Sequence, residues 1–225
     1  MGEHVATLGW DRLSPPVQSR TPLLLLDAVG CAAAGVRLNP YPDFVGAILR
    51  AEGPRQASLW FQAEMTPAPH AALVNASLAH HVEMDDGNPR ASLHGGVSVV
   101  PAAVAVAETT GASGRELLIS IVAGYDAAVA CGRKLLRGIE DHRLHPPSMV
   151  GCFGAAAAAS RLWGLSAQEI ANALALAGTF LPMGPFEAFT KGAPVKDLYG
   201  GWPAMLGVHA ALLAREGLAG PHQVL

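Results

Sequence analysis

Residues 146–163 read PPSMVGCFGAAAAASRLW, an alanine-rich run that opens on a proline pair. Proline suits the first turn of a helix, and Gly164 directly after the run suits a helix end. A run that is apolar on nearly every side predicts a helix buried among other helices. Short side chains let helix backbones approach one another closely, so this stretch indicates packing of helix against helix.

Helical signals continue on both sides of this stretch. Two of the expected helices begin with capping boxes, in which Ser113 precedes Glu116 and Ser166 precedes Glu169. Further helices are expected over residues 17–34, 41–51, 69–85, 113–136, 166–177 and 202–216, and from Ser98 onward. Residues 57–61 are expected as a short strand or an extended segment, and residues 180–199 as a long loop.

No alternating strand series and no repeated strand–helix–strand pattern occurs in the sequence. The fold class is therefore predicted as all-α, a multi-helix bundle that forms a single domain over residues 1–225. The formal net charge is −3, and no block of lysine and arginine is present, so nucleic acid is not an expected partner.

Apolar stretches are shorter than the roughly 20 residues that a membrane span needs, and the N-terminus lacks a secretion-signal pattern. No membrane partner is therefore expected. The cysteines, Cys31, Cys131 and Cys152, are scattered and odd in number, which predicts a reduced protein in the cytoplasm.

Three polar segments interrupt this apolar chain. The first covers residues 80–101 (HHVEMDDGNPRASLHGGVSVVP), the second residues 144–148 (LHPPS) and the third residues 191–201 (KGAPVKDLYGG). Charged residues make up only 15% of the chain, so such clusters stand out. Ionisable groups crowded into an apolar protein shift one another's pKa values, and that is typical of acid–base sites.

In the first polar segment, a helix that reaches Asp85 places His81 and Asp85 on one face, and His94 follows after a loop. One alternative is a plain helix end with solvated acids, although the helix dipole disfavours acids there. Another alternative is a metal site with ligands among His80, His81, Glu83, Asp85 and Asp86. No HExxH or similar ligand spacing occurs, so neither a metal nor a cofactor is expected.

The other two polar segments predict a base and an anion site. His145 precedes a helix, whose positive end favours a neutral imidazole that can act as a base. Lys191 and Lys196 lie in a glycine-rich loop beside a helix start, which suits a carboxylate or phosphate. Arg90 is a further candidate for the same anion. The alternatives are a histidine that only fills a loop and a loop that is only solvated.

Several motifs in order along the chain resemble those of the MmgE/PrpD family. They are residues 23–36 (LLLLDAVGCAAAGV), 73–86 (LVNASLAHHVEMDD), 93–108 (LHGGVSVVPAAVAVAE), 145–166 (HPPSMVGCFGAAAAASRLWGLS) and 195–221 (VKDLYGGWPAMLGVHAALLAREGLAGP). The resemblance implies a helical domain of an enzyme that needs no metal or organic cofactor. It further implies a lyase or isomerase that carries out acid–base chemistry alpha to a carboxylate. Dehydration, decarboxylation and epimerisation of a small carboxylic acid all remain open.

Individual residues take roles from the same resemblance. His94 and His145 match the family's proton carriers, Lys196 matches its carboxylate-holding lysine, and Asp85 and Asp86 match its paired acids. The expected substrate-binding residues are Glu83, Arg90, Lys191 and Tyr199.

The sequence also departs from the family pattern. Glu83 stands where aspartate is usual and Tyr199 where histidine is common. Gly87 replaces a threonine, so one hydroxyl contact is missing, and Gly95 replaces a proline.

The resemblance also predicts partners. Family members carry a smaller lid domain and are usually homodimers, and this chain shows no lid. We therefore expect a homodimer, or a hetero-oligomer with a lid-bearing chain. The alternative function is a non-catalytic or half-site subunit that dimerises and needs such a chain.

Overall fold

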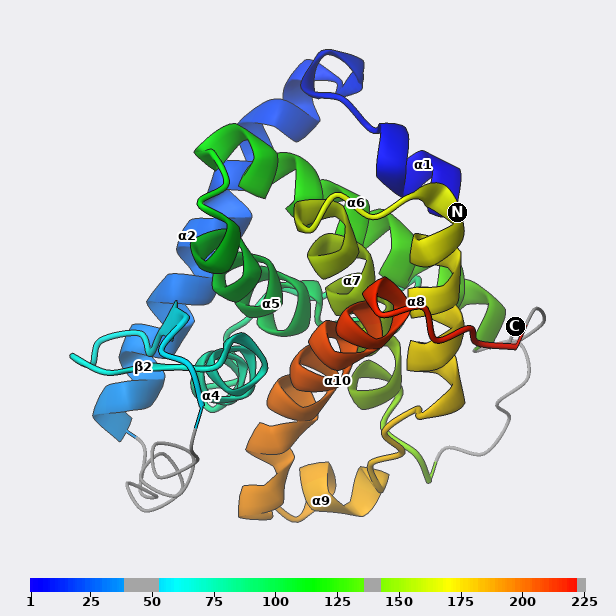
Figure 1. Cartoon of the computed structure of the whole chain (residues 1–225). Helices are drawn as coiled ribbons and strands as arrows, with labels where there is room; N and C mark the ends of the chain where they lie inside the picture. Colours follow the sequence, from blue (N-terminus) through cyan, green and yellow to red (C-terminus); the bar gives the residue numbers. More distant parts are fainter. Residues whose placement is uncertain (39–52, 136–142, 222–225) are drawn as a thin grey trace.

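The computed structural model describes residues 1–38, 53–135 and 143–221, and its elements are overwhelmingly helical (Figure 1). The α-helices are α1 Gly2–Thr7, α2 Pro15–Leu38, α4 Ala68–His80, α5 Gly95–Thr110, α6 Gly114–Leu135, α7 Pro146–Leu162, α8 Ala167–Thr179, α9 Phe186–Thr190 and α10 Leu198–Arg215. Two 3₁₀ turns, η1 Trp10–Arg12 and η3 Pro194–Asp197, and one hairpin of β1 Ala57–Ser58 and β2 Met65–Thr66 complete the described elements. The all-α prediction is confirmed. The helix expected over residues 41–51 lies outside the described residues.

Helix α7 is the centre of the bundle (Figure 1). Its residues from Ser148 to Ser160 are buried throughout, and α5, α6, α8 and α10 all pack against it. The alanine run makes this possible because short side chains leave room for a neighbouring helix on every side. The prediction of a buried helix at this place is confirmed.

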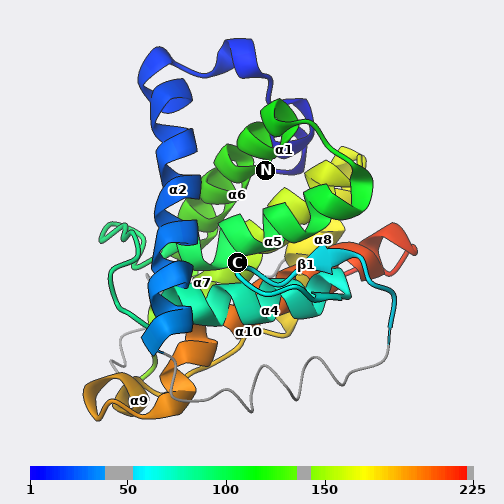
Figure 2. The same ribbon diagram turned by 90° about the vertical axis from the view of Figure 1, so that its left-hand side faces the viewer.

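Helix α2 stands at the edge of the bundle, where it packs on α4 and α5 (Figure 2). Its outer side exposes apolar side chains, with Leu23 51% and Leu26 66% accessible. Within the described ranges it is the one helix long and apolar enough to cross a membrane by length and composition. The expectation that no segment has this length is therefore wrong. The same test selects core helices of soluble proteins, so the absence of a membrane partner stays a prediction.

The helix expected over residues 69–85 ends earlier, at His80. Glu83 adopts a left-handed backbone with φ 53°, which a continuing α-helix excludes. Consequently His81 and Asp85 do not share a helix face, and that prediction is wrong. Asp85 instead turns back toward the end of α4.

Helix α5 begins at Gly95, before the expected start at Ser98. Asp86 takes the capping role, since its Oδ1 accepts a hydrogen bond from the Gly96 N–H at 2.6 Å. Ser98 is buried and donates to the Gly200 carbonyl oxygen at 3.3 Å. Pro101 accordingly lies inside the helix and beyond its first turn.

The segment expected as a loop over residues 180–199 contains α9 and η3, and α10 begins at Leu198. Helix α10 therefore includes the glycine pair Gly200–Gly201. A Cβ at Gly200 would lie 3.0 Å from the His80 Cβ, so this glycine permits close contact between α10 and α4. It marks a helix crossing rather than a loop.

The Ser166–Glu169 capping box is confirmed, with both hydrogen bonds present at 3.3 and 2.7 Å. Ser113 accepts from the Glu116 N–H at 3.2 Å, while the Glu116 carboxylate binds Arg161 at 3.4 Å.

Candidate active site

The three polar segments come together at one end of the bundle. His81 of the first segment binds Asp197 of the third, with 2.7 Å between Nδ1 and Oδ2. His145 of the second segment lies beside Tyr199 of the third, with 5.1 Å between ring centroids. Residues far apart in the sequence therefore face one another around the first turns of α5, α7 and α10.

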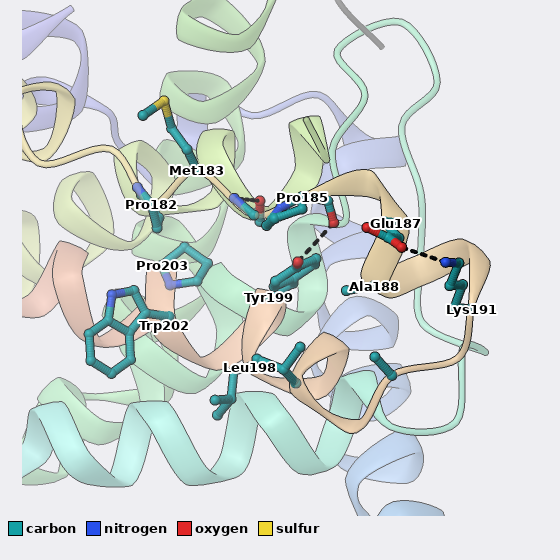
Figure 3. A pocket seen from close by; sticks show the side chains of 14 residues that line it. Pro182, Met183, Pro185, Glu187, Ala188, Lys191, Leu198, Tyr199, Trp202 and Pro203 are labelled. Carbon is teal, nitrogen blue, oxygen red and sulfur yellow. Dashed lines mark hydrogen bonds and ion pairs between the residues drawn. The ribbon is translucent and has the colours of Figure 1, made fainter. Parts of the chain in front are cut away.

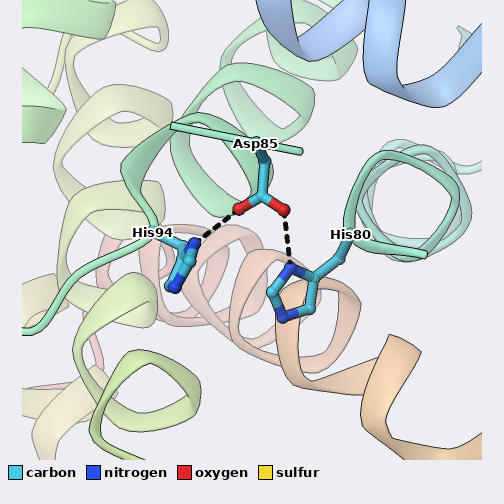
Figure 4. A group of neighbouring side chains, drawn as sticks. All are labelled: His80, Asp85 and His94. Atoms are coloured by element: carbon cyan, nitrogen blue, oxygen red, sulfur yellow. Dashed lines mark hydrogen bonds and ion pairs between the residues drawn. The ribbon is translucent and has the colours of Figure 1, made fainter. Parts of the chain in front are cut away.

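Asp85 joins two histidines at the centre of this group (Figure 4). Its side chain is fully buried, and its two oxygens lie 3.1 Å from His80 Nδ1 and 2.6 Å from His94 Nδ1. A carboxylate only accepts hydrogen bonds, so both Nδ1 atoms donate. Each imidazole is thereby oriented, and its Nε2 remains for other partners.

The pKa values of the two histidines shift in opposite directions, although both bind the carboxylate of Asp85. Burial alone raises the pKa of Asp85, but the hydrogen bonds from His80 and His94 outweigh it and bring the pKa to about 2. The hydrogen bond to Asp85 raises the pKa of His94. Burial lowers the pKa of His80 in spite of the same carboxylate. His94 therefore binds a proton more readily than His80 does.

His145 has the opposite environment. It is 4% exposed, its neighbours are the rings of Tyr199, Phe189 and Phe186, and its Nδ1 is buried without a hydrogen-bond partner. Burial lowers the pKa of His145 to about 4, and the charges of His80 and His94 act in the same direction. His145 is therefore a neutral base at pH 7.

Lys196 supplies the positive charge of the site. It is 7% exposed, its Nζ lies 5.8 Å from the centroid of the Phe189 ring, and it forms an ion pair with Glu83. Burial lowers the pKa of Lys196 to about 8, whereas the charge of Asp197 raises it. A buried ammonium beside an aromatic ring favours an anionic partner.

Asp86 supports the structure around the group formed by His80, Asp85 and His94. Besides capping α5, it accepts a hydrogen bond from the Tyr125 hydroxyl at 3.0 Å. Burial raises its pKa, and the hydrogen bonds from Gly96 and Tyr125 oppose that shift. The two adjacent acids therefore have different roles. Asp85 binds the two histidines, and Asp86 caps the helix that follows His94.

The remaining predicted site residues lie in different places. Arg90 is exposed. Lys191 is exposed, pairs with Glu187 at 2.6 Å and lines the cavity described below; among the described residues neither forms a hydrogen bond or ion pair with the histidines. Tyr199 does reach the site, although its hydroxyl donates to the Pro185 carbonyl oxygen at 2.8 Å. The structure therefore brings together His94, His145, Lys196, Asp85, Glu83 and Tyr199 of the predicted set.

Two functional contacts escaped sequence reasoning. The sequence identifies His80 only as a possible metal ligand, because nothing in the pair His80-His81 indicates which ring is buried. Tyr125 lies within α6, far from Asp86 in sequence, and carries no local signal of its contact.

Tyr199 also lines a cavity of about 550 Å³ (Figure 3). Most of its walls are apolar; they include Pro182, Met183, Leu198, Trp202 and Pro203. Two residues of its wall, Ser148 and Gly184, link it to His145. The Ser148 Oγ donates to the His145 carbonyl oxygen at 2.6 Å and accepts from the Gly184 N–H at 3.3 Å. This volume is in the range of small-molecule sites.

His80, Asp85 and His94 are also the described residues best placed to hold a metal ion, with ligand atoms within 4.8 Å of one another. Two imidazoles and a carboxylate suit a transition metal. The same atoms already satisfy one another by hydrogen bonds, so the cluster is accounted for as a hydrogen-bonded triad.

Comparison with known proteins identifies the family of this chain. A family model described as the MmgE/PrpD N-terminal domain matches residues 1–225. The chain belongs to the MmgE/PrpD family. The resemblance drawn from the sequence motifs is thereby confirmed, and the helical bundle is this family's N-terminal domain.

Curated relatives of this MmgE/PrpD chain are cis-aconitate decarboxylases. The human protein is 29% identical over 219 residues, which cover 95% of this chain and 45% of the relative. The mouse protein is 29% identical over 96% of this chain and 44% of its own length. A cis-aconitate decarboxylase-like protein of Aspergillus oryzae is 29% identical over 92% of this chain and 44% of its own length. The chain thus spans less than half the length of these relatives.

Proposed function

We propose that this chain carries the acid–base site of a lyase that acts on a small unsaturated polycarboxylate of the cis-aconitate type. The observation that carries the proposal is the pair His94 and His145, whose pKa values are shifted in opposite directions. Titratable groups whose pKa values are driven apart are typical of an acid and a base that work together. The cis-aconitate decarboxylases among the relatives support the substrate class.

Each residue has a role in this proposal. Lys196 binds a substrate carboxylate and stabilises the negative charge that develops next to it. In a decarboxylation, the bond to the departing carboxylate breaks, CO₂ leaves, and the electron pair left on carbon takes a proton from His94. In a dehydration or an epimerisation, neutral His145 first removes the proton alpha to a carboxylate. A positioned acid or base of this kind contributes roughly 10²–10⁴ in rate.

The proposal includes a covering partner. The His94 side chain is 32% exposed, so water reaches the proton donor. A second chain that covers this end of the bundle would exclude water and strengthen the electrostatics. We infer self-association or a lid-bearing partner in the cytoplasm.

Turnover in D₂O tests the proposal. The full chain is incubated with cis-aconitate and with hydroxylated di- and tricarboxylates, and CO₂ release and deuterium at carbon are followed by NMR. We expect at least one reaction, lost in His94→Ala and His145→Ala. His4→Ala is the matched control, because His4 pairs with Asp126 at 2.8 Å on the exposed surface of α1 and α6.

Two results would count against the proposal. Exchange that persists in both active-site variants would show that these histidines are not the proton carriers. Absence of CO₂ release and exchange with every substrate would favour the non-catalytic subunit instead.

A further inference from the structure

Glu83 is the carboxylate that occupies Lys196 in this structure. Its side chain is 43% exposed, and its Oε1 pairs with Lys196 Nζ and lies 3.9 Å from His80 Nδ1. The carboxylate therefore sits at the place where the proposed substrate carboxylate would bind. Family resemblance placed Glu83 among the substrate-binding residues, whereas here it takes the position of a ligand.

Access to Lys196 depends on Glu83. The Nζ atom is shielded from solvent, so a ligand carboxylate reaches it only if a neighbour moves. Glu83, on the loop between α4 and α5, and Phe189, whose ring centroid lies 5.8 Å from Nζ, are both 43% exposed, and Glu83 is the one that forms an ion pair with Nζ. Its backbone is in the left-handed region (φ 53°), which a non-glycine residue adopts at a cost.

We propose that Glu83 is a built-in carboxylate that occupies Lys196 until a ligand carboxylate displaces it. This inference rests on the proposed function, because it concerns the same lysine. It gives the site a preference for polycarboxylates. A monocarboxylate only exchanges one ion pair for another, whereas a polycarboxylate keeps further carboxylates to contact His94.

Calorimetric titration with tricarballylate, a saturated tricarboxylate, tests the inference in the full chain at pH 7. Glu83→Gln keeps the size of the side chain and removes its charge. We expect the affinity to rise about tenfold, since a competing ion pair of modest strength is gone. Glu83→Gly, which also relieves the left-handed backbone, should show the same increase, and Lys196→Met should abolish binding.

Glu216→Gln is the matched control. It removes the carboxylate partner of Arg215 in a pair that is exposed at 43% and 72% and lies at the end of α10 away from Lys196. Its affinity should equal that of the unchanged chain. Thermal melting of each variant confirms that it is folded.

An unchanged or weaker affinity in Glu83→Gln would overturn the inference, as would absence of tricarballylate binding in both Glu83 variants. The result is separable from the proposed function. Tighter binding without any CO₂ release or proton exchange would leave Glu83 as a competitor and remove the lyase. Turnover in the unchanged chain together with an unchanged affinity in Glu83→Gln would support the lyase and reject Glu83 as a competitor.

Discussion

His94 and His145 occupy equivalent positions in two parts of the molecule. Each is the N-cap residue of a helix, His94 with φ −98° and ψ 88° before α5, and His145 with φ −94° and ψ 99° before α7. Yet the pKa of His94 is raised and that of His145 is lowered to about 4. Of these two histidines, only His94 has an ion-pair carboxylate among the described residues. Both lie at a helix start, so the opposite directions of their pKa shifts come from their neighbours and not from the helix dipole.

Removal of the Asp85 carboxylate should abolish the difference in direction between the pKa shifts of His94 and His145. In Asp85→Asn, His94 loses its buried partner, so its pKa should fall below the ordinary value and turnover should drop by roughly 10²–10⁴. The pKa is followed by NMR titration of the imidazole carbon protons.

Asp126→Asn, which removes the partner of the surface residue His4, is the control and should leave turnover unchanged. A His94 pKa that stays raised in Asp85→Asn would show that Asp85 is not the cause of the shift.

Replacement of the other histidine should separate stability from activity. His145→Phe fits its aromatic surroundings, so it should abolish turnover while the protein stays folded. The folded-state pKa of His145, about 4, lies below the ordinary value of 6.5, so its stabilising contribution is present above pH 6.5 and is lost as the pH falls toward 4.

The unchanged protein should accordingly lose roughly 1 kcal/mol more than His145→Phe between pH 6.5 and pH 4, after allowance for solvent screening. Urea unfolding at both pH values measures the difference. Identical pH dependence in the two proteins would exclude His145 as a buried neutral base.

Tyr125→Phe probes the support of the His94 side. It removes the hydroxyl that donates to Asp86 and leaves the ring in place. We expect a loss of about 1 kcal/mol in the free energy of unfolding, because a buried carboxylate loses a donor. Tyr199→Phe, whose hydroxyl binds Pro185, serves as the comparison on the His145 side. Equal turnover in Tyr125→Phe and Tyr199→Phe would mean that the position of His94 at the start of α5 does not depend on the hydrogen bond from Tyr125 to Asp86.

Ser148→Ala should have the smallest effect. Its hydroxyl links the His145 backbone to Gly184, so its loss should cost roughly 0.5–1.5 kcal/mol of stability and lower turnover only a few-fold. Urea unfolding and steady-state turnover report the two effects. Loss of turnover as large as that of His145→Phe would assign Ser148 a direct chemical role.

Local signals predicted much of this molecule, and long-range contacts explain the rest. Periodicity, prolines and capping residues were sufficient for α6, α7 and α8, because these features act within a few residues. The early end of α4 depends on contacts of Asp85 with His80 and His94, which only the folded chain brings together. The early start of α10 depends on the fit of Gly200 against His80.

The site shows the same division. His94, His145 and Lys196 could be named from motifs, whereas their charge states could not. Those states follow from Asp85, from the aromatic rings and from burial, none of which is encoded next to the residue concerned. His81 illustrates the limit, since its partner Asp197 lies more than a hundred residues away.

The contact between Gly95 and Tyr125 has an evolutionary consequence. A Cβ at Gly95 would collide with the Tyr125 ring, which fills the space in front of the helix start. The proline that resemblance places at this position is thus barred here as long as residue 125 is tyrosine. Substitutions at positions 95 and 125 are therefore epistatic. A smaller residue at 125 has to come first, and that substitution removes the hydroxyl that donates a hydrogen bond to Asp86. This chain can therefore acquire a proline at position 95 only through a less stable intermediate.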